Sequence, residues 1–78
     1  MKPLRELFSH ILGIPKDRLT KEASPETISE WDSVNNLLLI SEIEKEYGVI
    51  VTIHEVYTLK NLGDVYDFIH KKGVKTKF

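Results

Sequence analysis

The 78-residue sequence contains no cysteine, only one tryptophan and no long apolar run. Without cysteine the chain can form neither a disulfide nor a thiolate-bound zinc site, so packing and helix termini must stabilise the fold. This composition fits a reducing, cytosolic setting. No segment approaches the roughly 20 consecutive apolar residues of a membrane-spanning helix. The start, MKPLRELFSH, mixes charges into its apolar positions, unlike a secretion signal. We therefore expect a cytoplasmic protein without a membrane span.

The length is sufficient for one small domain with one modest core. No internal repeat is visible, and the spacing of apolar residues is helical almost throughout. The sequence therefore predicts an all-α fold, a small bundle of three to four helices with a long loop between the first and second helices. We expect a monomer with a single domain over residues 1–73 and a frayed basic end at residues 74–78.

The formal net charge of −1 hides an uneven distribution of charged residues. Residues 22–46 hold seven acids against one base, Lys45, whereas the end of the chain, KKGVKTKF, holds four lysines. An acidic middle disfavours nucleic acid, whose binding needs Lys and Arg to release counterions, and it suits a basic partner surface. The alternative is that the acids only keep a small domain soluble, and charge alone leaves that open.

The first helix is expected to begin at Pro3, a favourable first helical residue, and to end at Gly13. Its apolar residues recur at helical spacing: Leu4, Leu7, Phe8, Ile11 and Leu12. The connection that follows, residues 14–31, carries two prolines, and its apolar residues are spaced too irregularly for one helix. We expect it to pack over the helices as an ordered loop, with Trp31 as its anchor.

The second helix is expected to begin near Asp32 or Ser33 and to run to about Tyr47, with Gly48 as a left-handed cap. The run YGVIVTI, residues 47–53, is rich in residues that favour strands. We nevertheless reject a strand, because no second run offers it a partner.

Two further helices are indicated by capping residues. Thr52 followed three residues later by Glu55 fits a capping box and predicts a short third helix. Asn61 is the expected N-cap of the last helix, which ends near Lys72.

The second helix carries apolar residues on more than one side. On a helical wheel at about 100° per residue, the arc that faces the core contains Leu39, Asn36, Ile43, Tyr47 and Ile40. Val34 and Leu38 lie opposite, and Leu37 lies between the two groups. Either the long loop covers Val34 and Leu38, or they form an exposed apolar strip for a partner.

The start of the second helix is a suitable place for a phosphate ester. Unpaired N–H groups and the partial positive charge of the first turn stabilise a negative group there, and Ser33 offers a hydroxyl. The simpler interpretation is that Ser33 is only an N-cap, worth about 1 kcal/mol. The dipeptide alone leaves both interpretations open.

Neither a catalytic site nor a metal site is expected. A hydrolytic serine needs a base within hydrogen-bond reach and an oxyanion site. The candidate bases, His10, His54 and His70, belong to different elements and have no supporting motif. Binding of nucleic acid through the terminal lysines competes poorly with the acidic middle.

The segment DSVNNLLLISEIEKEYGV, with a long loop before it and LGDVYDFI after it, resembles the acyl carrier protein family. In that family an Asp-Ser-Leu tripeptide opens the second helix, and its serine is esterified by 4′-phosphopantetheine from coenzyme A. The thiol of this group carries acyl chains as thioesters. The tripeptide here is Asp32-Ser33-Val34. The resemblance, which extends to about Lys72, implies a non-catalytic carrier whose Ser33 holds the arm. Asp32 would help to present the arm to a phosphopantetheinyl transferase.

The resemblance also assigns roles to other positions. Enzymes that load and process acyl groups would bind at Val34, Asn35, Leu38, Ser41, Glu44, Lys45, Ile53 and Tyr57. An acyl cleft would be bordered by Leu39, Ile43 and Val56.

One departure from the family pattern suggests a specialised carrier. Carriers of fatty-acid synthesis usually have acids at the positions of Asn35, Leu38, Ile53 and Tyr57. We therefore expect a carrier for fatty-acid, polyketide or another specialised pathway whose partners dock more through apolar contact than through charge. The alternatives are an aminoacyl or peptidyl carrier and an unmodified helical interaction module in which Ser33 is only a cap.

Overall fold

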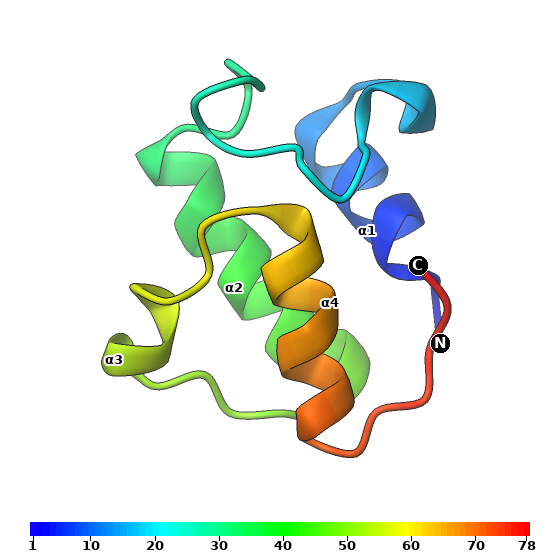
Figure 1. The fold of residues 1–78 in the computed structure, drawn as a ribbon, viewed down its shortest axis with the longest axis vertical. Coiled ribbons are helices and arrows are strands. Elements are labelled where there is room, and N and C mark those ends of the chain that lie inside the picture. Colours follow the sequence, from blue (N-terminus) through cyan, green and yellow to red (C-terminus); the bar gives the residue numbers. More distant parts are fainter.

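A computed structural model describes residues 1–78 as an all-helical chain without strands (Figure 1). Its elements are α1 (Leu4–Leu12), the short 3₁₀ helix η1 (Lys16–Arg18), α2 (Ser33–Tyr47), α3 (Ile53–Val56) and α4 (Leu62–Lys71). The predicted helical bundle with a long loop before its second main helix is confirmed. The sequence did not predict η1, because KDR after a proline carries no apolar periodicity.

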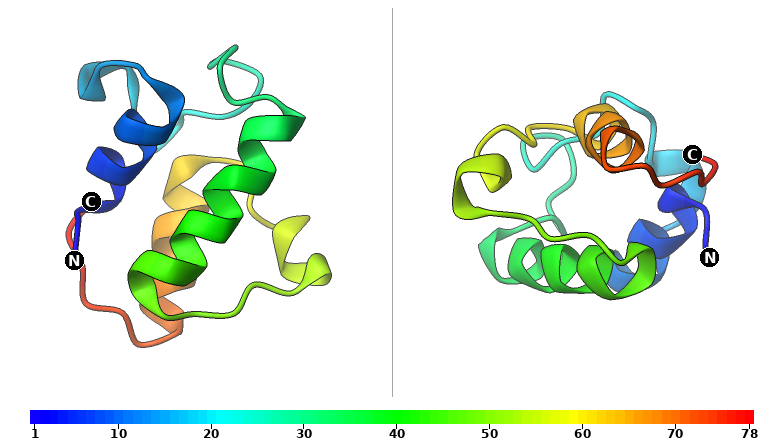
Figure 2. Two further views of the ribbon diagram at one scale, coloured as in Figure 1. Left: turned by 180° about the vertical axis from the view of Figure 1, so that it is seen from behind. Right: turned by 90° about the horizontal axis from the view of Figure 1, so that it is seen from below.

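The two longest helices, α2 and α4, lie on opposite sides of the core. α1 closes one end of the molecule and α3 lies at the other (Figures 1 and 2). Both chain termini lie beside α1, far from the first turn of α2 in both figures. This arrangement separates the start of α2 from the side of the molecule where the chain ends meet.

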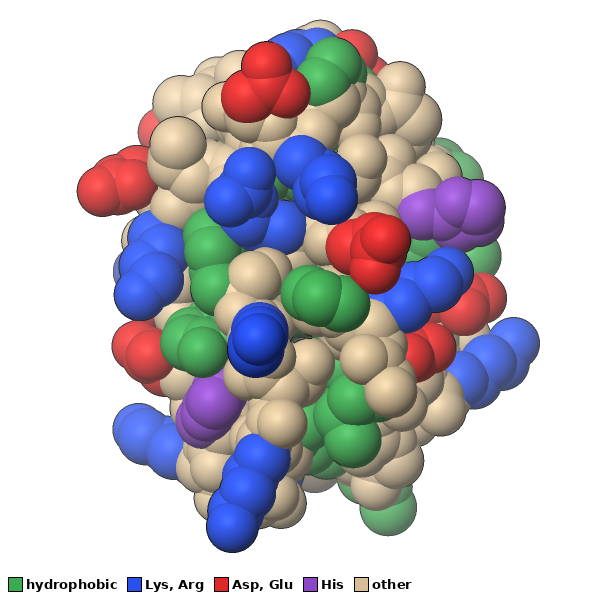
Figure 3. All heavy atoms as spheres, turned by 90° about the vertical axis from the view of Figure 1, so that its right-hand side faces the viewer, with side chains coloured by type: hydrophobic (Ala, Val, Ile, Leu, Met, Phe, Trp, Pro, Cys, Tyr) green, Lys and Arg blue, Asp and Glu red, His purple; other side chains and the backbone are tan.

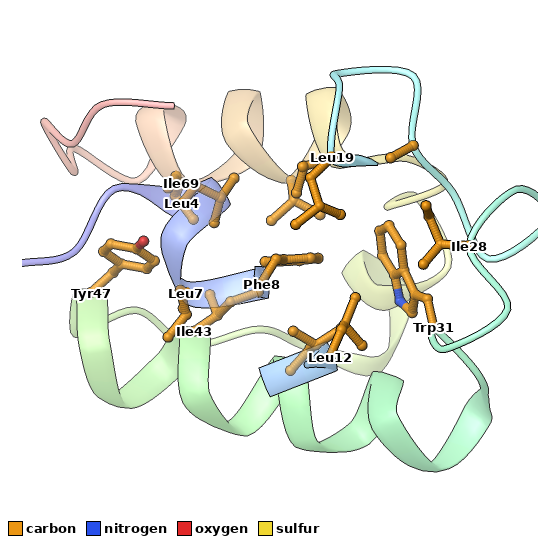
Figure 4. Close-up of a cluster of buried hydrophobic side chains, with 14 of the residues drawn as sticks. Leu4, Leu7, Phe8, Leu12, Leu19, Ile28, Trp31, Ile43, Tyr47 and Ile69 are labelled. Carbon is orange, nitrogen blue, oxygen red and sulfur yellow. The ribbon is translucent and has the colours of Figure 1, made fainter. Parts of the chain in front are cut away.

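The core draws on every long helix and on the loop between α1 and α2. α1 contributes four residues of the stripe expected from its spacing, buried Leu4, Leu7, Phe8 and Leu12, whereas the fifth, Ile11, is half-buried. Leu39, Ile43, Leu62, Val65 and Ile69 come from α2 and α4, and Leu19, Ile28 and Trp31 from the loop. The ring of Phe8 packs edge to face with Trp31 at 5.2 Å between centroids (Figure 4). Trp31 therefore anchors the loop as predicted, because its large ring is buried among these apolar side chains.

Helix ends follow the predicted capping residues closely. Gly13 and Gly48 have φ angles of 67° and 66°, the left-handed conformation that glycine adopts without steric cost. The capping box of Thr52 and Glu55 opens α3, and Asn61 caps α4 by accepting from the backbone N–H of Asp64. One boundary differs, since Pro3 precedes α1 as its N-cap and does not belong to the helix.

The end of the chain, residues 74–78, differs from the frayed end expected from the sequence. The carbonyl oxygens of Lys77 and Phe78 accept hydrogen bonds of 3.0 and 2.7 Å from the backbone N–H groups of Leu4 and Arg5. These donors belong to the first turn of α1, where a helix supplies no acceptors of its own. Two side chains of this segment are buried: Val74 and Thr76. The segment thus caps α1 from a distant part of the sequence.

No helix of the chain combines the length and the apolar character needed to cross a membrane.

Candidate functional site

The hydroxyl of Ser33 stands free at the first residue of α2. Asp32 is the N-cap, and its carboxylate accepts the backbone N–H of Asn35 at 2.8 Å. Ser33 is exposed and its side chain takes part in no hydrogen bond. The interpretation of Ser33 as the helix cap is therefore wrong, since Asp32 already fills that role.

The surroundings of Ser33 fit a phosphate ester. The backbone N–H groups of Ser33 and Val34 have no partner, and no acidic side chain lies in the first turn of α2. Free N–H groups and the helix dipole stabilise a negative group at this position. The carboxylate of Asp32 bonds to Asn35, so its charge is partly compensated by that donor.

Two asparagines hold the segment that leads into Ser33. The side-chain amide of Asn35 donates to the carbonyl oxygen of Glu30 at 2.8 Å, and the Asn36 oxygen accepts the indole N–H of Trp31 at 2.9 Å. Both bonds join the first turn of α2 to the loop before it. Asn36 thereby gains a partner for a polar group on the core side, and the amide of Asn35, predicted to meet partners, is engaged within the chain. The residue types alone gave no signal for these pairings.

A charged pair supports the same segment from η1. The two guanidinium nitrogens of Arg18 bond to the two carboxylate oxygens of Glu30, both at 3.2 Å. This hydrogen-bonded guanidinium lowers the pKa of Glu30 below its ordinary value of 4.5. At α3 the backbone N–H of Thr52, followed by the amine of Lys72, lowers the pKa of Glu55 in the same direction.

These lowered pKa values predict a loss of stability in acid. A carboxyl group whose pKa is lower in the folded than in the unfolded state stabilises the fold above its unfolded pKa, and this contribution disappears as the pH falls through the folded pKa. The urea midpoint is therefore expected to fall between about pH 5 and about pH 3. A variant with Glu30→Gln and Glu55→Gln should show a shallower fall. An identical decline in the variant and the parent would contradict these assignments.

The predicted partner-binding residues of α2 and α3 are largely exposed. Val34, Ile53 and Tyr57 have about three quarters of their surface exposed (74%, 77% and 76%), and Leu38 has 47%. The long loop does not cover Val34 and Leu38, so these residues form the exposed strip that the sequence offered as one of two possibilities. Leu37, which the helical wheel placed between the two groups, is exposed as well. Ile50, to which the sequence analysis gave no role, adds to the exposed apolar area.

Two polar members of this surface, Glu44 and Lys45, have partners within the chain. Glu44 accepts the backbone N–H of Val51 at 2.9 Å and so ties α2 to the segment before α3. Lys45 is exposed and lies 3.9 Å from Glu42. Ser41 is half-buried. On the other flank, Leu38 lines a hollow of about 340 Å³ with residues of α1, among them His10 and Ile11.

Two of the three residues expected to border an acyl cleft are fully buried in the core. Leu39 and Ile43 are each 1% exposed, and Val56 is half-buried. The four hollows on the surface are lined by other residues. An acyl chain could therefore reach Leu39 and Ile43 only if neighbouring elements moved apart. α3 is the one α-helix that buries none of its own residues.

None of the three histidines shares a hydrogen bond with Ser33. His10 and His54 are exposed on α1 and α3, and His70 bonds to the carbonyl oxygen of Thr76 at 3.0 Å. No cluster of His, Asp and Glu has the grouping of a metal site. Since Ser33 has no neighbouring base, the arrangement gives no support to nucleophilic catalysis.

Comparison with known proteins identifies relatives along nearly the whole chain. The sequence profile of the family described as "Phosphopantetheine attachment site" matches residues 2–69. An acyl carrier protein of Acidothermus cellulolyticus is 30% identical over 66 residues, which are 85% of this chain and 79% of that protein. The acyl carrier protein of Thermosynechococcus vestitus is 29% identical over 72 residues (92% and 89%), and that of Thermotoga maritima 28% over 69 (88% and 85%).

Proposed function

Because this chain belongs to the acyl carrier protein family, with 4′-phosphopantetheine as its prosthetic group, we propose that Ser33 is the residue that carries the arm. The protein is a carrier and not an enzyme. The observation that carries the proposal is the free, exposed hydroxyl of Ser33 at the start of α2. When bound, the group supplies a thiol that holds acyl chains as thioesters, a sulfur that this cysteine-free sequence lacks.

The residues around Ser33 orient its hydroxyl for the transferase. Asp32 fixes the first turn of α2 through its bond to Asn35, so the serine side chain is left to react. The pair of Trp31 and Asn36 holds the incoming segment against the core. A free N–H at Ser33 itself stabilises the phosphodiester charge after attachment.

Partner enzymes are proposed to dock on α2 and α3 through apolar contact. Three acids of α2 are engaged within the chain: Glu44 with Val51, Glu46 with the backbone N–H of Lys2 at 2.6 Å, and Glu42 with Lys45. Their charge is thus less available to a basic partner. The exposed side chains of Val34, Leu38, Ile53 and Tyr57 offer an apolar area instead.

This surface supports a carrier for a specialised fatty-acid, polyketide or other acyl pathway. General fatty-acid synthase enzymes that recognise acids on their carrier gain little from neutral side chains at these positions. Cargo would be sheltered beside Leu39, Ile43 and Val56 after displacement of α3, which is held by the ion pair of Glu55 and Lys72 at 3.1 Å.

One two-step experiment tests both the attachment site and the specialised role of the carrier. The full chain is incubated with coenzyme A and a broad-specificity phosphopantetheinyl transferase, and peptide mapping by mass spectrometry is expected to find one phosphopantetheine, on Ser33. The loaded chain is then offered to general fatty-acid synthase enzymes, and elongation is expected to be at least about tenfold slower than on a housekeeping carrier. Modification at another residue contradicts the attachment site, whereas equal elongation contradicts the specialised role.

A further inference from the structure

Most basic residues of the chain belong to its two end segments, and the fold brings these ends together. Residues 1–21 and 70–78 together hold nine Lys or Arg against two acids, a balance of +7. Residues 22–69 hold two against ten, a balance of −8. Backbone hydrogen bonds join the two ends, and Lys and Arg side chains lie over the face that they form (Figure 3). A chain that is nearly neutral as a whole therefore carries an excess of positive charge in its end segments and of negative charge in its middle.

Part of this surface is arranged by specific contacts. A guanidinium nitrogen of Arg5 donates to the carbonyl oxygen of Lys16 at 3.0 Å, and the guanidinium lies 5.7 Å from the ring centre of Phe78. The amine of Lys21 lies 5.3 Å from the ring centre of Tyr66 and 5.7 Å from that of Phe78. The backbone of Lys77 bonds to Leu4, which places Lys77 near Arg5 in the fold. These four cationic residues are named the basic face: Arg5, Lys16, Lys21 and Lys77.

A hollow of about 270 Å³ opens within the basic face, between the start of α1 and η1. Arg5 and Lys16 line it, together with Pro3, Glu6 and Phe78. The Nε–H of Arg5 is buried and has no acceptor within the chain. A carboxylate that entered the hollow would lie beside two cations, the side chains of Arg5 and Lys16.

We propose that the basic face binds an acidic segment of a partner protein, with a carboxylate side chain seated between Arg5 and Lys16. Charge complementarity of this kind raises association rates and selects partners. Glu6 beside the hollow and Asp17 beside Lys16 in the sequence favour a partner whose acids are separated by neutral residues over one with a dense row of negative charges.

A lipid surface and a nucleic acid fit the basic face less well. Surface helices that bind membranes pair their cations with exposed apolar side chains, but apart from Met1 the large exposed apolar residues of this chain belong to residues 34–57. Nucleic acid presents a dense row of phosphates, which Glu6 and Asp17 repel. The rings of Tyr66 and Phe78 are overlain by cations and are not free to stack with bases.

The basic face can be occupied while the proposed arm is in use. It lies beside the chain termini, across the molecule from the first turn of α2 (Figures 1 and 2). The molecule measures 28 × 24 × 19 Å, whereas charges are screened over about 8 Å at physiological ionic strength. The positive and negative sides therefore act independently. If Ser33 carries the arm, as proposed above, one protein can hold the carrier while others act on its cargo.

The test measures binding of the unmodified full chain to a fluorescein-labelled peptide of alternating glutamate and alanine, by fluorescence anisotropy. Lys16→Glu with Lys21→Glu is expected to weaken binding roughly tenfold or more at low salt, because two attractive contacts become repulsive. Lys60→Glu with Lys71→Glu changes the net charge equally outside the basic face and is expected to alter the affinity by less than about twofold. Circular dichroism verifies that both variants are helical, and Lys16→Gln replaces the double variant if it unfolds.

Three results would overturn the proposal. The first is no binding of the peptide by the parent chain, and the second is equal weakening in the two double variants. The third is tighter binding to another probe, either phosphatidylcholine vesicles containing phosphatidylserine or duplex DNA, than to the peptide. If that binding is lost in the Lys16→Glu, Lys21→Glu variant, the basic face belongs to a lipid or a nucleic acid. Since unmodified protein is used, none of these results depends on attachment at Ser33.

Discussion

A Ser33→Ala variant is expected to gain no phosphopantetheine under conditions that load the parent chain completely. The substitution removes the oxygen through which the ester forms, and loss of modification should be total. The variant should fold normally, because the N-cap of α2 is Asp32 and Ser33 is exposed without a hydrogen bond. Its free energy of unfolding should differ from that of the parent by less than about 0.5 kcal/mol. Intact mass after incubation with coenzyme A and transferase, with urea unfolding beside it, gives both quantities.

Ser29→Ala provides the matched control for this experiment. Ser29 is also exposed and lies in the loop just before α2, but its hydroxyl bonds to Glu30 and it does not begin a helix. We expect this variant to load like the parent. Loading of Ser33→Ala would place the arm elsewhere, and failure of all three proteins to load would favour an unmodified interaction module.

The helices were predictable because each has its own local signal. Gly13 and Gly48 end α1 and α2 in the left-handed conformation, and Thr52 with Glu55 opens α3, where the competing strand had no partner. The helical wheel placed Val34 and Leu38 outside the core arc of about 100°, but it left open whether the long loop covers them. Such features depend on residues a few positions apart, and a sequence displays these directly.

Features that join distant residues were not predictable. The capping of α1 by residues 74–78 depends on backbone carbonyls, which every residue carries, so lysine content suggested only a solvated end. Trp31 and Asn36 are only five positions apart, but their bond also needs the loop to turn the indole toward α2, and no spacing rule specifies that turn. The basic face likewise appears only when the two ends meet. In each case the contact depends on how segments are placed in the tertiary structure, and the sequence of each segment alone carries no signal for that placement.

Trp31→Ala is expected to cause the largest loss of stability, about 3–5 kcal/mol in the free energy of unfolding. Trp31 is 2% exposed, packs against Phe8 and joins the loop to α2. Its removal therefore leaves a cavity and deprives the Asn36 oxygen of its hydrogen-bond donor. Small domains are stable by only about 5–15 kcal/mol, and a loss of this size removes much of that margin. Because the loop fixes the first turn of α2, loading of Ser33 should slow even under conditions where the variant is folded.

The hydrogen bond is separated from the packing by a double-mutant cycle on Trp31 and Asn36. Trp31→Phe retains an apolar ring but leaves the Asn36 oxygen without its donor, and Asn36→Leu leaves the indole N–H without its acceptor. Each single variant should lose about 1–3 kcal/mol in the free energy of unfolding because one polar group is left without a hydrogen-bond partner, in addition to any packing change. The double variant leaves no polar group of this pair without a partner, so its loss of stability should be smaller than the sum of the losses in the two single variants. Urea unfolding of the four proteins measures this difference, and strictly additive losses would mean that the bond contributes nothing to holding the loop against the start of α2.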